Sequence, residues 1–122
     1  MTARVSERVA RWCDAWQGRS PEAVAARYRV DAIHEGAKVG RAMPELGRAH
    51  LEGAAELGVL KRRALDRVGN LHFEIVKTVE DARASVVEYL AHSDRRPARE
   101  RVVECIEWGP DGLIAASRVY HF

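Results

Sequence analysis

Apolar residues near the start of the chain recur at spacings of three and four, which is the period of an amphipathic helix. The stripe consists of Val5, Val9, Trp12, Cys13 and Trp16. It stops at Gly18, so the pattern predicts a helix of about three turns. The segment Ser20-Pro21-Glu22 then supplies an N-cap, a first-turn proline and an acidic residue at the positive end of a helix dipole. It predicts a second, short helix that reaches about Tyr28.

The apolar period changes to two from Arg29 to Glu35, which predicts a short strand. The side expected to face the core carries Val30, Ala32 and His34. Pro44-Glu45 then opens another helical stretch, which continues to Val68 and ends in the turn Gly69-Asn70. The residues that share one face of this predicted helix are Leu46, Ala49, His50, Gly53 and Leu57.

The rest of the chain has the alternating pattern of strands. Four runs are separated by short turns: Leu71 to Val79, Ala84 to His92, Arg99 to Trp108, and Leu113 to His121. Short turns make antiparallel neighbours. Helices followed by a meander predict an α+β fold in which the helices cover one face of the sheet. A length of 122 residues suits a single domain over 1–122.

The last hairpin can be placed in register from its turn. If Gly109 to Gly112 form this turn, Trp108 lies opposite Leu113 and Glu104 lies opposite Ser117. The inner face then carries Val102, Glu104, Ile106, Trp108, Leu113, Ala115, Ser117, Val119 and His121, and the outer face carries Arg101, Val103, Cys105, Glu107, Ile114, Ala116, Arg118 and Tyr120. The same parity on the preceding hairpin groups Leu71, Phe73 and Ile75 with Val86, Glu88, Leu90 and His92, and it places His72, Glu74, Val76, Val87 and Tyr89 outside.

Two carboxylates, Glu88 and Glu104, therefore fall among aliphatic neighbours, where a bare charge is costly. An apolar environment raises the pKa of a carboxyl group, so either residue could donate or accept a proton in a pocket. The alternative is structural: each residue pairs with an inner Arg or His, or reaches water at the sheet edge. His34 has the same two interpretations, as a neutral hydrogen-bonding group in a site or as a satisfied semi-buried histidine.

Aromatic residues on the predicted inner faces suggest the lining of an apolar ligand cavity. These are Trp12, Trp16, Tyr28, Phe73 and Trp108, with Ser117 and Val119 beside them on the sheet. Aromatic residues at helical spacing also form ordinary core, and this alternative stays open.

The charge balance and the cysteine content exclude several classes of binding partner. There are 20 Lys and Arg against 18 Asp and Glu, so no basic stripe for nucleic acid is expected. No apolar run approaches the roughly 20 residues that cross a bilayer, and the stretch Met1–Trp12 does not resemble a signal peptide. We therefore expect a soluble, cytoplasmic protein without a membrane partner. Cys13 and Cys105 lack the spacing of a disulfide framework or a zinc motif and are interpreted as small buried hydrophobes, and we expect no metal and no cofactor.

Several local strings, taken in their order, resemble one superfamily. They are Ala15-Trp16-Gln17-Gly18, Tyr28-Arg29-Val30-Asp31-Ala32, Gly47-Arg48-Ala49-His50-Leu51, and Gly109-Pro110-Asp111-Gly112-Leu113-Ile114 followed by Arg118-Val119-Tyr120-His121. Across nearly the whole chain, their order and spacing resemble the SnoaL-like branch of the nuclear-transport-factor-2-like superfamily.

The resemblance implies a cone, in which three helices pack on a strongly bent sheet around a pocket that opens at one end. It also implies a homodimer formed through the outer sheet face, here the set Tyr89, Arg101, Arg118 and Tyr120. Members of the superfamily bind small hydrophobic or aromatic molecules. Some are polyketide cyclases, ketosteroid isomerases, epoxide hydrolases or dehydratases.

The enzymatic patterns of these relatives carry over incompletely. The position of the isomerase base falls on Gly36, and no oxyanion Tyr stands near Trp12. The epoxide hydrolase Arg-x-Asp falls on Val86-Val87-Glu88, and the second Asp of that scheme falls on Val119. Two hypotheses remain. One is an acid/base enzyme of the cyclase, isomerase or lyase type that uses Glu104 with Glu88 and His34. The other is a non-catalytic ligand-binding or dimerisation module with the same pocket.

Overall fold

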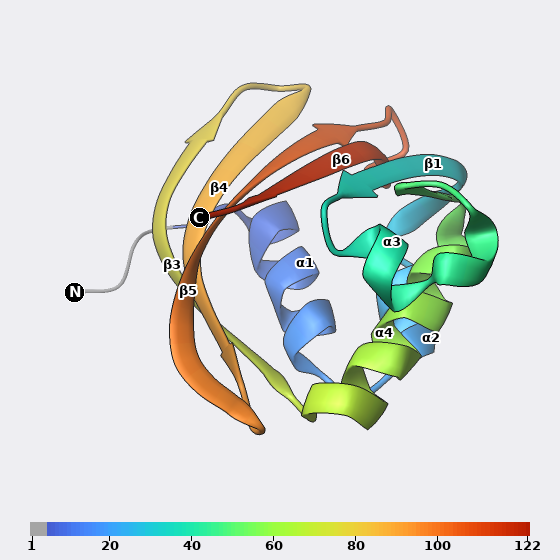
Figure 1. Cartoon of the computed structure of the whole chain (residues 1–122). Helices are drawn as coiled ribbons and strands as arrows, with labels where there is room; N and C mark the ends of the chain where they lie inside the picture. Colours follow the sequence, from blue (N-terminus) through green and yellow to red (C-terminus); the bar gives the residue numbers. More distant parts are fainter. Residues whose placement is uncertain (1–4) are drawn as a thin grey trace.

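A computed structural model describes residues 5–122, in which helices cover the concave face of a curved sheet (Figure 1). The helices are α1 (Glu7–Gln17), α2 (Pro21–Ala25), α3 (Val39–Ala42) and α4 (Ala54–Val68), with a 3₁₀ turn, η1 (Pro44–Leu46). The strands are β1 (Tyr28–Gly36), β2 (His50–Glu52), β3 (Leu71–Glu80), β4 (Ala84–Ser93), β5 (Arg96–Trp108) and β6 (Ile114–His121). The predicted α+β class is therefore confirmed. The first four residues of the stretch Met1–Trp12 lie outside the described residues.

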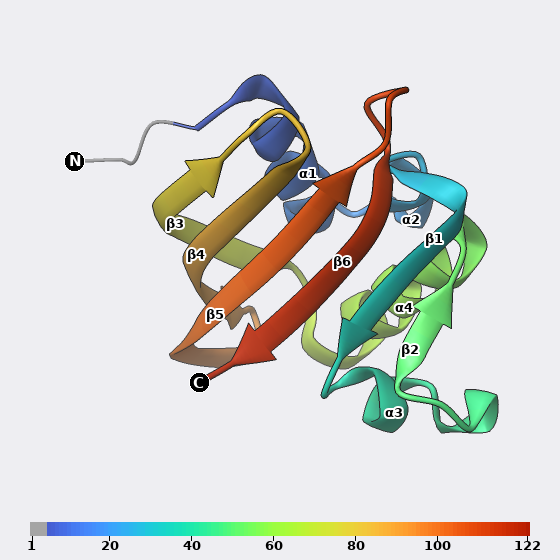
Figure 2. The same cartoon turned by 90° about the horizontal axis from the view of Figure 1, so that it is seen from above.

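The six strands follow the order β2-β1-β6-β5-β4-β3, which Figure 2 shows from above. Only β1 and β6 are parallel among these neighbours, and the other pairs are antiparallel. The long strands β3, β4 and β5 bend around α1, so that one face of the sheet is concave (Figure 1). No helix within residues 5–122 is long and apolar enough to cross a membrane.

The first two helices form where the sequence predicts them. The Ser20 hydroxyl accepts the backbone N–H of Ala23 at 3.0 Å, which confirms the predicted N-cap of α2. That helix ends at Ala25, earlier than predicted, because β1 already begins at Tyr28. In β1, Ala32 and His34 face the core as predicted. Val30 is 90% exposed and does not, because the pairing of β1 with β6 is irregular before Ile33.

The predicted helix from Pro44 to Val68 is wrong in its first half. This segment contains η1, the edge strand β2 and only then α4, and a further short helix, α3, precedes it. The chain reverses at Gly53, which has a φ of 89° and whose N–H donates to the Ala32 carbonyl at 2.7 Å. His50 consequently lies on an edge strand, with Nε2 at 3.1 Å from a Glu52 carboxylate oxygen, and not on an apolar helix face.

The register of the β3–β4 hairpin corrects the predicted position of Glu88. Lys77 pairs with Glu88 as the sequence parity requires, but Ile75 pairs with Tyr89, so the extra residue Val76 shifts the register by one. Val87 and Tyr89 are therefore buried on the inner face, although the sequence analysis placed them outside. The side chain of Glu88 lies on the outer face, where the Arg101 guanidinium donates to it at 2.7 Å.

The β5–β6 hairpin keeps the predicted parity with a register displaced by two residues. Glu104 pairs with Val119 rather than with Ser117. Because a displacement of two preserves the faces, both glutamate and serine are buried inside, as predicted. The register shifts again at Trp108, which pairs with Ile114. Ile114 is fully buried as a result, and its predicted place on the outer face is wrong.

Two polar side chains hold α1 against the rest of the fold. The buried Lys61 of α4 donates from Nζ to the backbone carbonyl of Trp16, close to the end of α1. The Gln17 side-chain oxygen accepts the backbone N–H of Phe73 at 2.8 Å. These bonds fix the distance between α1, α4 and β3, and thereby the width of the space between helices and sheet.

Candidate functional site

A cavity of about 650 Å³ lies between the inner face of the sheet and the helices α1, α3 and α4. This volume is within the range of small-molecule sites. Four of the predicted ligand-binding residues line it: Trp12, Trp16, Phe73 and Val119. Of the predicted catalytic residues, Glu104 and His34 line it and Glu88 does not.

Aromatic rings form the deep wall of this cavity. Trp12 stacks on Phe73 with ring centroids 5.8 Å apart, and it meets Tyr89 edge-on at 5.6 Å. Phe73 and Tyr89 are 4.5 Å apart. Such rings pack through dispersion and complementary edge and face charges, so the wall is rigid and largely apolar.

Glu104 is an ionisable residue buried beside this aromatic wall, with 3% of its surface exposed. The Tyr89 hydroxyl donates to Oε1 of Glu104 at 3.1 Å, and Oε2 has no hydrogen-bond partner among residues 5–122. Burial raises the pKa of Glu104 from 4.5 to about 8, while the donors of Tyr89 and Trp12 oppose this rise. At neutral pH the group is therefore a carboxylic acid, whose proton can be offered to a ligand.

His34 supplies a second polar side chain in the lining of the cavity. Its Nδ1 lies 2.7 Å from the buried Ser117 hydroxyl, and its Nε2 makes no hydrogen bond to any of residues 5–122. Burial, with a smaller contribution from His121, lowers the pKa of His34 to about 4. The imidazole is therefore neutral at pH 7, and the nitrogen that is not protonated can accept a hydrogen bond.

The two polar groups stand on strands that are separated by β6. His34 pairs with Ser117, and Glu104 pairs with Val119, so the Cα atoms lie roughly 12 Å apart on the pleated sheet. Side chains from a concave face converge over this distance. A small molecule between them can therefore be held by both.

The other predicted pocket residues lie behind the lining or away from it. Tyr28 and Ser117 are buried behind it, where the Tyr28 hydroxyl accepts the Trp16 indole N–H at 3.0 Å. Trp108 lies near the N-terminal end of α1, under the Arg8 guanidinium. Its indole N–H donates to the Ser85 hydroxyl at 2.8 Å. These three predicted positions are not part of the cavity lining.

The sequence analysis missed Tyr89, which contributes both an aromatic wall and the hydrogen bond to Glu104. The signal that could have found it is the alternation of Val87 and Tyr89, which continues the inner face of β4 once the bulge at Val76 is allowed for. It also missed a charged cluster of three residues around Glu100. Lys38 Nζ and His121 Nδ1 lie 2.8 and 2.9 Å from its carboxylate oxygens.

Neither cysteine takes part in this site. Cys13 is buried on α1, where burial raises the pKa of its thiol to about 11, and Cys105 is half-buried in β5. Within residues 5–122, no group of three or more His, Cys, Asp or Glu side chains is arranged to hold a metal ion.

Solved structures share this fold and its layered arrangement. A SnoaL-like protein of unknown function from Burkholderia thailandensis has a TM-score of 0.76 at 21% identity, over 93% of this chain and 89% of that one. A hypothetical protein with a ketosteroid isomerase-like fold from Catenulispora acidiphila, in complex with trimethylamine, has a TM-score of 0.77 at 19% identity, over 96% and 86%. An LEH-like epoxide hydrolase from M. tuberculosis has a TM-score of 0.72 at 24% identity, over 94% and 80%.

These likenesses define the nuclear-transport-factor-2-like class of cone-shaped α+β folds. Within that class, the SnoaL-like domain model matches residues 9–117. The chain therefore belongs to the SnoaL-like family, as its local strings indicated. A comparison with curated proteins gives no match. Because proteins of this fold differ in chemistry, the activity has to be argued from the site.

Proposed function

We propose that this protein binds a small, largely apolar molecule that carries a carbonyl oxygen, and that it transfers protons on that molecule. The observation that carries the proposal is the buried Glu104, which lines the cavity and whose Oε2 has no hydrogen-bond partner in the described part of the chain. A buried polar atom without a partner costs free energy unless a ligand satisfies it. A carbonyl oxygen that accepts the Glu104 proton is the complementary group.

The proton transfer follows from the two neutral groups. The Glu104 proton passes to the carbonyl oxygen, while Nε2 of His34 takes a proton from the adjacent carbon. The C–H electron pair becomes the new C=C bond, and the C=O π pair binds the proton from Glu104, which gives an enol. Glu104 is left as a carboxylate and His34 as an imidazolium. Return of the protons, to the same or another carbon, resets both residues.

Isotope exchange tests this proposal without knowledge of the natural substrate. Phenylacetone and tetralone are incubated with the protein in heavy water, and loss of the signal of the protons next to the carbonyl is followed by NMR. We expect wild-type protein to accelerate the exchange and Glu104→Gln to lower the rate by about a hundredfold. The bell-shaped pH profile should fall below about pH 4, where His34 is protonated, and above about pH 8, where Glu104 is ionised.

Glu88→Gln is the matched control, because the same change of residue is made on the outer face. It should leave the exchange rate within about twofold of wild type. If ketones bind in the cavity and no exchange occurs with any of them, the protein is a ligand-binding module and the acid/base assignment is wrong.

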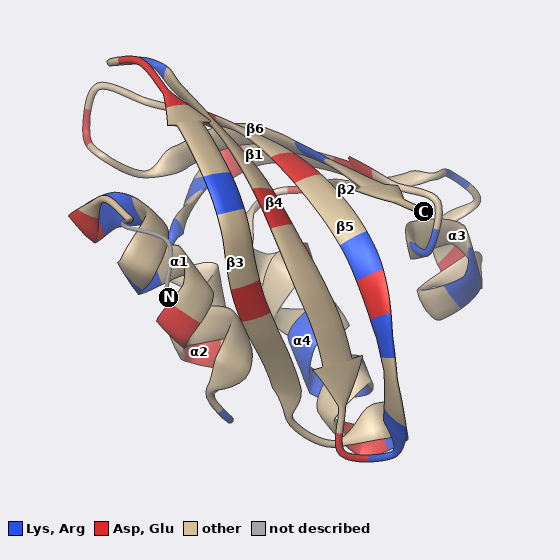
Figure 3. Cartoon of the chain, turned by 90° about the vertical axis from the view of Figure 1, so that its left-hand side faces the viewer, with Lys and Arg blue, Asp and Glu red and all other residues tan. Residues whose placement is uncertain are grey.

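The outer sheet face favours a second proposal, a homodimer. Apolar side chains exposed on this face include Val76, Val79, Val86 and Tyr120. Figure 3 shows that the same strands carry charged residues, of both signs on β3 and β5 and acidic on β4. Exposed apolar side chains on one face can be buried against a second copy of the chain, with the charged residues at the rim of the interface. Tyr89 is buried inside and is not part of this face, contrary to the sequence analysis.

A further inference from the structure

The wall of the cavity changes from apolar to basic toward its open end. The deep lining around Trp12 and Glu104 is almost fully buried, whereas five lining residues at the other end are exposed: Arg67, Arg96, Pro97, Ala98 and Arg99. The mouth of the cavity therefore lies between the end of α4 and the start of β5. Three of its five exposed residues are arginines.

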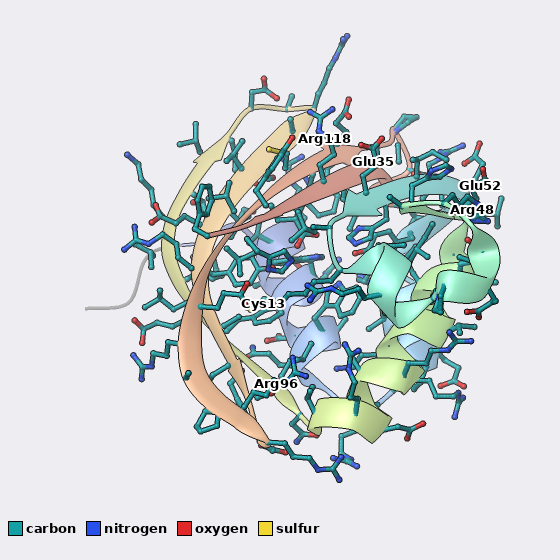
Figure 4. All side chains as sticks on the ribbon, viewed as in Figure 1. Cys13, Glu35, Arg48, Glu52, Arg96 and Arg118 are labelled. Atoms are coloured by element: carbon teal, nitrogen blue, oxygen red, sulfur yellow. The ribbon has the colours of Figure 1, made fainter. Side chains whose placement is uncertain are left out.

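Two hydrogen bonds donated by Arg95 bring Arg67 and Arg96 together at this mouth from distant parts of the chain. The Arg95 N–H donates to the Val68 carbonyl at 3.0 Å, and the Arg95 guanidinium donates to the Asp66 carbonyl at 2.6 Å. These bonds tie the β4–β5 turn to the last turn of α4. Figure 4 shows Arg96 on the side of β5 that faces α4.

Two of the acidic side chains near this mouth, Glu100 and Asp94, already have partners. Glu100 binds Lys38 and His121, and Asp94 accepts from the His72 ring at 2.8 Å. Arg99 pairs with Glu74 at 3.4 Å. Arg67 and Arg96, by contrast, make no ion pair or side-chain hydrogen bond with any of residues 5–122, so their guanidinium groups are available to an anion.

We propose that the ligand of this cavity is an elongated amphipathic anion, whose apolar body fills the cavity and whose carboxylate or phosphate is bound at the mouth by Arg67 and Arg96. Guanidinium groups match both anions through paired N–H donors. This inference rests on the proposed function, because the same cavity holds the body of the ligand. It adds the substrate class, namely a long chain that carries an anion at one end.

The length of the ligand follows from β5. Arg96 and Glu104 are eight residues apart on this strand, which is roughly 26 Å if the strand is straight. The strand curves strongly (Figure 1), and both side chains extend toward the ligand, so the gap to be spanned is shorter. A chain of about twelve carbons fits this gap better than a single aromatic ring does, since such a chain is roughly 15 Å long.

Displacement of a fluorescent dye tests the inference. The neutral apolar dye N-phenylnaphthylamine is bound first, and dodecanoate, dodecyl phosphate and dodecanamide then compete with it. We expect both anions to displace the dye from wild-type protein at about fivefold lower concentration than the amide, a modest factor because both arginines are exposed. Whichever anion is the stronger competitor identifies the head group. Hexanoate, which is too short to reach both ends, should compete at least about tenfold more weakly than dodecanoate.

The double variant R67Q/R96Q should bind the dye unchanged and lose the preference for anions. Both side chains are exposed and make no ion pair within residues 5–122, so the substitutions should leave folding intact. The control R62Q/R83Q removes the same charge at exposed sites outside the cavity lining and should keep the preference. If R67Q/R96Q still prefers the anions over the amide, or if wild type shows no such preference, the anion site is wrong and the proposed function is unaffected. Failure of the dye itself to bind wild-type protein overturns the proposed ligand cavity as well.

Discussion

At the scale of single residues, the site depends on one carboxyl group and its surroundings. Burial disfavours the charged form of Glu104, and only one of its two oxygens is satisfied, by Tyr89. The indole N–H of Trp12 also lowers the pKa of Glu104, but it is not within hydrogen-bond geometry of any acceptor among residues 5–122, so its effect is weak. Desolvation therefore outweighs the donors, and the acid form dominates at neutral pH.

This imbalance makes the stability of the fold depend on pH. The pKa of Glu104 is raised from 4.5 to about 8 in the folded chain, so between these values the folded state retains a proton that the unfolded state releases. Its contribution to stability is present below pH 4.5 and is lost as the pH rises toward 8. The free energy of unfolding of wild type should therefore fall, relative to that of Glu104→Gln, by about 1.4 kcal/mol for each pH unit in this window.

Urea unfolding of both proteins at pH 5, 6 and 7 checks this expectation. Wild type and variant share every other titrating group, so the difference between their free energies of unfolding isolates Glu104. A difference that does not change with pH would show that Glu104 is ionised in the folded state.

Tyr89→Phe tests how much the hydrogen bond from Tyr89 lowers the pKa of Glu104. The tyrosine hydroxyl donates to Oε1 and lowers the pKa of Glu104, so its removal should raise that pKa above about 8. Carbon NMR of the Glu104 carboxyl group during a pH titration measures the shift directly. A pKa below that of wild type would mean that Tyr89 does not stabilise the carboxylate.

At the scale of elements, alternation in the sequence was sufficient where the pairing is regular and failed where it is interrupted. The faces of β5 and β6 follow from parity up to the register shift at Trp108, so Glu104 and Ser117 were correctly placed inside. Parity cannot detect the extra residue Val76, which reverses the faces of the β3–β4 hairpin and moves Glu88 outside. The position of such a bulge depends on the curvature of the whole sheet, which is not a local property of the sequence.

The junction between β2 and α4 gives a prediction about stability. A Cβ on Gly53 would lie 2.5 Å from the Val30 carbonyl oxygen, and its φ of 89° disfavours any side chain. Gly53→Ala should therefore destabilise the fold by at least about 2 kcal/mol. Gly40→Ala is the control, since no atom lies within 4 Å of a Cβ there, and it should be neutral or slightly stabilising. Thermal unfolding compares them, and equal melting temperatures would refute the argument.

At the scale of the whole molecule, the two faces of the sheet differ in what covers them. The concave face is filled by α1 and by the cavity, and it carries the polar groups of the site. The convex face is covered by no element within residues 5–122. Figure 4 shows Glu35 and Arg118 on adjacent strands, on the side away from the helices, and the two are register partners of β1 and β6. A surface that combines charged residues of both signs with exposed valines can complement a second copy related by a two-fold axis.

The proposed homodimer predicts that a charge in the middle of this surface separates the copies. Val86 on β4 is 39% exposed and Val59 on α4 is 40% exposed, so a glutamate costs little folding energy at either position. Analytical ultracentrifugation should give wild type a mass near twice the 13.7 kDa of one chain. Val86→Glu should raise the dimer dissociation constant at least about tenfold, because it buries an unpaired charge in the interface. Val59→Glu should leave it unchanged, and equal effects of both variants would place the interface elsewhere.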